Sequence, residues 1–165
     1  MFSLNAPLPR DVHEIADRVA ADYPPDTVRP RDQRTLVVKR LGDPTDAARL
    51  TARAREVVTD QPPIAARARG VVRFEDPPAG QAPVLALDIE SPGLIDLHER
   101  LCAAFEPVEG IEGSAYHPHV TVARGPAVPD RAREASVEVC EWSIEHLQLY
   151  DASRHLSAGR IDLPA

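Results

Sequence analysis

The sequence predicts an α+β fold made of two halves of similar design. The order strand, helix, strand, with a glycine after the last strand, occurs at residues 2–42 and again at residues 84–125. In both stretches the helix repeats apolar residues with the period of one buried face, and the strand at residues 35–41 is rich in residues that favour β-structure. The chain has 165 residues, of which 43% are apolar. We therefore expect one domain over residues 1–165, with a core that needs no covalent staples.

The first half opens with a strand at residues 2–6 and a helix that begins near Pro9. Tyr23 and the two prolines after it end this helix. A β-rich segment at residues 35–41 follows and stops at Gly42, which starts a turn. The buried face of the helix consists of Val12, Ile15, Ala16, Val19 and Ala20.

A connecting region follows the first half. We predict a helix with Asp43 as its N-cap and Pro44 at its first position, and then a long strand at residues 64–75. The alternation of an unbroken strand places several arginines on one face, where they either attract an anionic ligand or are simply solvated. These arginines are Arg67, Arg69 and Arg73.

The second half opens with a strand at residues 84–89 and a helix capped by Ser91, with Pro92 following. Its second strand is expected at residues 118–124. If the halves are equivalent, this strand and the strand at residues 35–41 face each other across a cleft, related by approximate two-fold symmetry. The helix buries Leu94, Leu97, Leu101 and Phe105, and three short strands are predicted near residues 136–142, 145–151 and 156–163.

Composition limits the classes of function. A net charge of −7 argues against a protein that coats long nucleic acid, but it allows recognition of one phosphate or one RNA end. Cys102 and Cys140 belong to no Cys-x-x-Cys pair, and no cluster of histidines and carboxylates has metal-site spacing. We therefore predict reduced, buried thiols, no metal and no cofactor. No apolar stretch approaches the roughly 20 residues that span a bilayer, and no leader is visible. We expect a cytoplasmic protein without an obligate protein partner.

The sharpest chemical signal is the tripeptide His119-Val120-Thr121. Residues i and i+2 of a strand point to the same face, so the imidazole and the hydroxyl project together. A histidine exchanges protons near neutral pH, and a threonine hydroxyl donates a hydrogen bond to a phosphate oxygen. Together they form half of an acid–base site for phosphoester chemistry without a metal. The alternative is a half-buried strand histidine bonded to a neighbouring carbonyl.

The segment around this tripeptide, residues 116–124, resembles the second signature of the 2H phosphoesterases. These include the bacterial and archaeal RNA 2′,3′-cyclic phosphodiesterases, also called 2′-5′ RNA ligases. The resemblance extends to the opening strand at residues 2–9 and to a closing hairpin at residues 142–153. It implies a two-lobed, duplicated β-α-β architecture with antiparallel sheets around a central cleft, to which each lobe supplies one His-x-Thr strand. In the family one histidine is the general base on water, the other is the general acid on the leaving ribose oxygen, and the threonines hold the phosphate.

The first signature of the family is degenerate in this chain. It should lie at residues 34–42, but no histidine is present there. In one register Thr35 replaces the histidine and Val37 replaces its partner threonine. In the other register the replacements are Arg34 and Leu36. Half of the acid–base pair is missing in either case, and the loss of one such group typically costs about 10²–10⁴ in rate.

Further residues are predicted to contact the substrate. Arg34 would clamp the phosphate with its planar guanidinium, and Lys39 faces the cleft in the first of the two registers. Arg124 matches an arginine of the family and serves either the phosphate or a structural salt bridge. His117 shares a strand face with His119, roughly 6–7 Å away along the strand, and is either a second imidazole or a rim residue.

The resemblance implies metal-independent hydrolysis of an RNA-terminal 2′,3′-cyclic phosphate that leaves a 2′-phosphate. His119 would transfer a proton and Thr121 would bind the phosphate. Two alternatives stay open. The missing histidine suggests a non-catalytic binder of nucleotides or RNA ends, and a third possibility is a phosphodiesterase for a small cyclic nucleotide.

Overall fold

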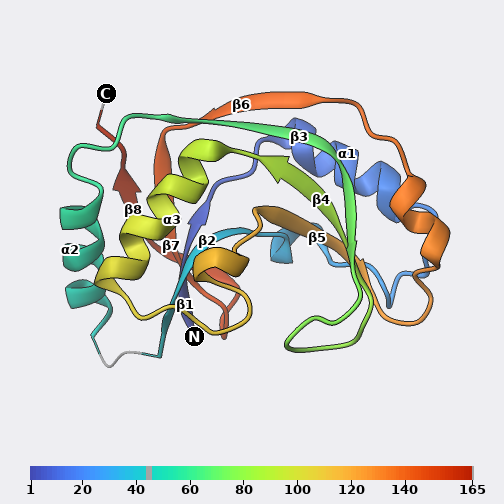
Figure 1. The fold of residues 1–165 in the computed structure, drawn as a ribbon, viewed down its shortest axis with the longest axis horizontal. Coiled ribbons are helices and arrows are strands. Elements are labelled where there is room, and N and C mark those ends of the chain that lie inside the picture. Colours follow the sequence, from blue (N-terminus) through green and yellow to red (C-terminus); the bar gives the residue numbers. More distant parts are fainter. Residues whose placement is uncertain (44–45, 165) are drawn as a thin grey trace.

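Two four-stranded antiparallel sheets form the framework of the molecule (Figure 1). The computed structural model describes residues 1–43 and 46–164. Sheet A has the strand order β2-β1-β7-β8, and sheet B has the order β5-β4-β3-β6. β2 and β5 are therefore edge strands of different sheets, and they contact each other. The α+β class and the antiparallel sheets that the sequence predicts are confirmed.

The strands lie close to their predicted positions, and β6 differs most. Sheet A consists of β1 (Phe2–Ala6), β2 (Leu36–Gly42), β7 (His146–Asp151) and β8 (Leu156–Asp162). Sheet B consists of β3 (Ile64–Phe74), β4 (Val84–Glu90), β5 (His119–Arg124) and β6 (Cys140–Ile144). β6 begins later than predicted because its pairing with β3 extends only from Ile64 to Ala68, directly before a register shift in β3.

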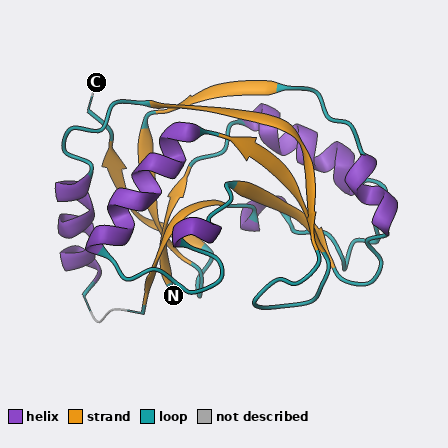
Figure 2. Ribbon diagram, in the orientation of Figure 1, coloured by secondary structure: helices purple, strands orange, loops and turns teal. Residues whose placement is uncertain are grey.

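The helix of each half packs against the sheet of the other half (Figure 2). α1 (Arg10–Ala20), which follows β1, packs against β5 of sheet B. α3 (Pro92–Ala104), which follows β4, packs against β2 of sheet A, next to α2 (Ala47–Val57). Short 3₁₀ turns lie at Arg31–Gln33, Gly113–Ala115 and Asp130–Glu134. The exchange of helices ties the two halves into one packed unit.

The predicted helix starts are right for α3 and wrong for α2. Ser91 caps α3 through its hydroxyl, as predicted. α2 is capped instead by Asp46, whose carboxylate accepts a hydrogen bond from Arg49 N at 3.1 Å. Asp43 is therefore not the cap, because it lies too far ahead of the first helical N–H groups. The predicted helical position of Pro44 lies outside the described residues.

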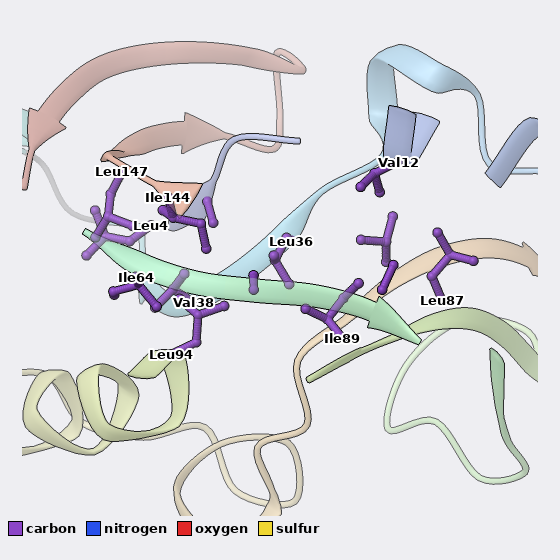
Figure 3. Packing of buried hydrophobic residues seen from close by; sticks show 14 of the residues in the cluster. Leu4, Val12, Leu36, Val38, Ile64, Leu87, Ile89, Leu94, Ile144 and Leu147 are labelled. Carbon is purple, nitrogen blue, oxygen red and sulfur yellow. The ribbon is translucent and has the colours of Figure 1, made fainter. Parts of the chain in front are cut away.

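The apolar core runs without interruption from one sheet to the other (Figure 3). Leu36 and Val38 of β2 are fully buried, and Leu94 of α3 packs with them. Leu87 and Ile89 continue the same cluster in β4. Because burying one such side chain contributes about 1.5–3 kcal/mol, this shared core is the main support of both edge strands.

A bulge interrupts the alternation of side chains in β2. Val37 and Lys39 pair with successive residues of β1, so Val38 is an extra residue. Val38 and Lys39 are both buried. A bulge of this kind shifts the alternation by one position, so Arg40 returns to the face of Val37.

The same bulge recurs at the equivalent position of β5. Thr121 and Ala123 pair with successive residues of β4, and Val122 is the extra residue. Val122 and Ala123 are both buried, and Arg124 returns to the face of Thr121. Residues 35–40 and 119–124 therefore have the same strand geometry.

A register shift at Arg69 in β3 overturns the predicted basic surface. Arg67 pairs with Glu90, whereas Arg73 pairs with Leu85 of the core face, where its side chain is only 7% exposed. Arg67 and Arg69 both form ion pairs with Glu90. The three arginines thus do not share one face, because the shift breaks the alternation on which that prediction depends.

A buried ion pair holds β2 to the loop before β5. The bulge directs the lysine of this pair, Lys39, into the core. Lys39 is fully buried, and its Nζ lies 2.6 Å from Glu112 Oε2. The carbonyls of Arg40 and Glu106 accept its other protons, at 2.7 and 3.0 Å. The Glu112 carboxylate also accepts from the backbone N–H groups of Arg40 and Val108. Burial alone raises the pKa of Glu112, but these partners lower it overall, so the carboxylate stays ionised.

We expect Glu112→Gln to destabilise the fold by about 3–5 kcal/mol, because it leaves the Lys39 ammonium buried without a counter-charge. Urea unfolding at pH 7 measures this loss. Glu109→Gln, an exposed change in the same loop, is the control and should leave the unfolding midpoint unchanged. Equal midpoints for both variants would show that the buried pair does not support the fold.

Candidate functional site

β5 places His119 and Thr121 on the face of sheet B that points away from the core. They lie opposite Asp88 and Ala86 of β4. Both are half-buried, whereas Val120 between them is fully buried in the core. The two side chains that the sequence singles out therefore share one accessible face, with Asp88 as their closest polar neighbour in the next strand.

The hydrogen bonding of His119 determines which nitrogen is free for proton transfer. Its Nδ1 lies 2.7 Å from the backbone oxygen of His117. Because a carbonyl oxygen only accepts, Nδ1 carries the proton of the neutral ring and Nε2 keeps the lone pair. Burial lowers the pKa of His119, and the charges of Arg40 and Arg124 lower it further, against the opposing bond to the carbonyl. The ring is thus a neutral acceptor at neutral pH, which a general base requires.

A second imidazole lies beside the first. The ring centres of His117 and His119 are 6.5 Å apart, and Phe74 packs edge-on against both rings. His117 Nε2 lies 2.8 Å from Asp88 Oδ1, and Arg69 Nε donates to Asp88 Oδ2 at 2.9 Å. Burial alone raises the pKa of Asp88, but hydrogen bonds from His117 and Arg69 lower it overall. This ionised acceptor orients His117 with Nε2–H toward it, which leaves Nδ1 for another partner.

The matching bulges decide the register of the degenerate first signature. Thr35, not Arg34, stands where the second half has its histidine, and Val37 replaces the partner threonine. Arg40 then corresponds to Arg124. Sequence periodicity does not identify Arg40 as a site residue, because unbroken alternation turns it away from Val37. The available signal was the arginine that ends both segments, Thr-Leu-Val-Val-Lys-Arg and His-Val-Thr-Val-Ala-Arg.

Two arginines of equivalent position flank this face. The side chain of Arg40 is 30% exposed, and its guanidinium lies 3.8 Å from the carboxylate of Glu112. Arg124 donates from Nη1 to the backbone oxygen of Ala79 at 2.9 Å, and its buried Nε has no partner within the described chain. Because a guanidinium has five N–H donors, each arginine keeps donors for an anion.

Arg34 and Lys39 do not reach this face, so their predicted roles as phosphate ligands are wrong. The side chain of Arg34 is 2% exposed and donates to Asp17 Oδ1 at 2.6 Å and to the backbone oxygen of His13 at 3.2 Å. It fastens the segment before β2 to α1. The ammonium group of Lys39 is engaged in its buried ion pair with Glu112. The sequence shows the charge of both residues but not the internal partners that bind it.

A separate cavity of about 330 Å³ lies over the outer face of sheet A. Asn5 of β1 and Gln148 and Tyr150 of β7 line it from the sheet. His13 of α1 and Thr35 line it from the side. The cavity therefore borders the position that corresponds to His119 in the other half.

The described residues show no further class of site. Across residues 1–43 and 46–164, no three side chains of His, Cys, Asp or Glu converge in the way a metal ion needs. None of the helices in these ranges has the length and apolar character to cross a bilayer. Cys102 and Cys140 are free thiols of intermediate burial.

Comparison with known proteins identifies one matching family. Residues 9–156 match the family described as the 2'-5' RNA ligase superfamily. No curated protein sequence matches the chain.

Solved structures with the same fold align over nearly the whole chain. TT0787 of Thermus thermophilus has 22% identity and a TM-score of 0.71, covering 98% of this chain and 97% of that one. Escherichia coli LigT complexed with 3'-AMP has 19% identity and a TM-score of 0.66, covering 99% and 97%. The same protein complexed with NADP+ has 18% identity and a TM-score of 0.61, covering 99% and 97%. These likenesses establish the fold.

We expect an NMR titration of the His119 ring to give a pKa below the ordinary value of about 6.5, with the proton of the neutral ring on Nδ1. The urea-unfolded chain is the reference and should titrate near that value. Arg40→Met should raise the pKa of His119 in the folded protein, because it removes a positive charge that opposes protonation. An unchanged pKa in this variant would contradict the position assigned to Arg40.

Proposed function

This chain belongs to the 2'-5' RNA ligase superfamily, and we propose that it is a metal-independent phosphodiesterase that hydrolyses a 2′,3′-cyclic phosphate at an RNA end. The observation that carries this proposal is the neutral His119 ring, whose Nδ1 is committed to a carbonyl and whose Nε2 is left free beside Thr121. The family and the fold support phosphoester chemistry in general. The cyclic-phosphate substrate is our inference.

In the proposed reaction, Nε2 of His119 takes a proton from water. The water oxygen forms a bond to phosphorus, and the bond between phosphorus and O3′ breaks. Its electron pair leaves with O3′, which takes up a proton from the acid of the site. The products are a 2′-phosphate and a 3′-hydroxyl. The Thr121 hydroxyl donates to a phosphate oxygen, and Arg40 and Arg124 stabilise the negative charge that develops there.

We assign the role of the acid to His117. Its ring centre lies 6.5 Å from that of His119, so both rings are near enough to reach one bound phosphate group. With Nε2–H directed to Asp88, the protonated ring presents Nδ1–H to the leaving oxygen. His117 would thus supply the second imidazole that the degenerate first signature lacks. Asp88 and Arg69 are positioning residues for this ring.

The neighbouring structures favour a nucleotide ligand. Escherichia coli LigT, which shares the fold, has been crystallised with 3'-AMP, ATP and NADP+. A nucleotide carrying a terminal or cyclic phosphate is therefore the ligand class that we propose for this chain.

One observation favours a second function, the binding of nucleotides or RNA ends without turnover. Thr35 and Val37 stand in the places of the first histidine and threonine, so the first half supplies no imidazole at the equivalent position. If His117 does not transfer a proton, the remaining groups still form a phosphate-binding surface. Thr121, Arg40 and Arg124 would supply its donors.

We expect the protein to open an RNA oligonucleotide ending in a 2′,3′-cyclic phosphate in the presence of EDTA, and His119→Ala to lower kcat/KM by about 10²–10⁴. Chromatography of the product identifies the 2′-phosphate. A parallel panel of 2′,3′- and 3′,5′-cyclic mononucleotides separates this activity from that of a small cyclic-nucleotide phosphodiesterase. Saturable binding with no turnover in the wild type would instead establish the binding function.

We expect His117→Ala to lose about 10²–10⁴ in kcat/KM with the cyclic phosphate but little with a 4-nitrophenyl nucleoside phosphodiester. Nitrophenolate leaves without protonation, so this substrate does not need the acid. His119→Ala is the matched comparison and should lose rate with both substrates, because both need the base. Equal losses with both substrates in His117→Ala would remove His117 from the role of acid.

A further inference from the structure

We propose that Gly80, in the loop between β3 and β4, is a positioning residue that holds the guanidinium of Arg124 ready for an anion at the candidate site. The loop consists of residues 75–83 and joins the ends of the two strands (Figure 1). This role rests on the proposed function, because Arg124 is one of the two arginines assigned there to the phosphate. Gly80 acts only through Arg124 and contributes no group to the chemistry.

The loop packs directly against the side chain of Arg124. Nη1 of Arg124 donates to the backbone oxygen of Ala79 at 2.9 Å. A β-carbon at Gly80 would overlap with this Nη1 and would lie 3.2 Å from Cζ. Gly80 also has a φ of +79°, which residues with a side chain rarely adopt. The guanidinium therefore reaches the Ala79 carbonyl only because the next residue has no side chain.

A second close approach fixes the loop to the end of β5. Gly125, which follows Arg124, donates from its backbone N–H to the backbone oxygen of Pro83 at 2.9 Å. A β-carbon at Gly125 would lie 2.9 Å from Gln81 Oε1, closer than such contacts normally are. The loop is thus held at contact distance on both sides of Gly80, and it provides a fixed support for the guanidinium.

The hydrogen bonds of Arg124 determine which of its donors an anion can reach. Nη1 is bonded to Ala79, and Nε is buried without a partner, so neither is open to a ligand. Nη2 forms no hydrogen bond within the described chain, and it is not among the buried polar atoms. It is therefore the accessible donor of a side chain that lies on the face of Thr121. A phosphate oxygen bound beside Thr121 would accept from it.

The charge of Arg124 is not compensated, unlike that of its counterpart in the first half. The guanidinium of Arg40 lies 3.8 Å from the Glu112 carboxylate, whereas no carboxylate in the described chain forms an ion pair with Arg124. Burial lowers the pKa of Arg124, and the positive charge of Arg29 lowers it further. Arg29 is close because its backbone N–H donates to Val122 of β5. A bound anion would stabilise this arrangement, and it would gain more from Arg124 than from Arg40.

Positioning Arg124 before binding should strengthen the binding of an anion. A long side chain that becomes ordered only in the complex loses rotamer freedom, which weakens affinity. In Gly80→Ala the new methyl group would displace Nη1 from Ala79, because the end of an arginine side chain moves more easily than the backbone. The variant should therefore keep its fold but lose the fixed position of the guanidinium.

The test compares two glycine variants that carry the same backbone strain. Gly80 and Gly110 have φ angles of +79° and +82°, but a β-carbon at Gly110 meets nothing within 4 Å. Inorganic phosphate is titrated into each protein and followed through the NMR signals of His119 and Thr121. We expect Gly80→Ala to weaken phosphate binding about tenfold and Gly110→Ala to bind like the wild type. Equal affinities in the two variants would overturn the proposal.

A double-mutant cycle shows whether the effect passes through the guanidinium. Arg124→Met removes the group that Gly80 is proposed to position. We expect Gly80→Ala to cause no further loss of phosphate affinity in this variant. If Gly80→Ala weakens binding by the same factor with and without Arg124, the glycine acts on the fold in general and the positioning role is lost.

A measurement on the wild type keeps the proposal testable if Gly80→Ala fails to fold. The bond from Nη1 to Ala79 should slow the rotation of the Arg124 guanidinium, measured by NMR, relative to that of the exposed Arg131. Equal rotation rates would overturn the anchoring, and a wild type that binds no phosphate would overturn the role of Arg124.

The outcomes also separate this inference from the proposed function. Tighter phosphate binding in the wild type than in Gly80→Ala supports the positioning role even if no cyclic phosphate is hydrolysed. Hydrolysis together with equal phosphate binding in both glycine variants would overturn the positioning role alone.

Discussion

The bulge shared by β2 and β5 is the constraint on which the rest of the structure depends. Strand side chains alternate, and one extra residue exchanges the two faces for everything that follows it. In β2 the bulge sends Lys39 into the core and Arg40 to the outer face. In β5 it buries Ala123 and returns Arg124 to the face of Thr121. Each half thereby places an arginine, and not its inner neighbour, beside the candidate site.

The burial of Lys39 has a structural consequence of its own. A buried ammonium is tolerated only with a well-bonded counter-charge, and Glu112 provides it from the loop that leads to β5. The same loop carries Tyr116, whose hydroxyl donates to the backbone oxygen of Val37 at 3.0 Å. The second half thus covers the open edge of β2. The first half does the same for β5, because Arg29 N donates to the backbone oxygen of Val122 at 2.7 Å.

Structural features that depend on sequence pattern and composition could be predicted from the sequence. The order of helices and strands along the chain, the helix faces and the shared face of His119 and Thr121 follow from periodicity and from the resemblance to the 2H phosphoesterases. The positions of Lys39, Arg40 and Arg73 could not be predicted in this way, because a bulge depends on pairing with a neighbouring strand. Partners distant in the chain, such as Asp17 for Arg34, are likewise invisible to local reasoning.

The two halves keep the same backbone but carry different chemistry on it. In the second half, His119 of β5 and His117 just before it place two imidazoles 6.5 Å apart, and Asp88 accepts a hydrogen bond from the second ring. In the first half, Thr35 and Val37 stand at the equivalent positions and contribute no ionisable group. A duplicated fold normally needs both halves for acid and base. In the proposed reaction the second half carries both imidazoles, so the first half is released from proton transfer.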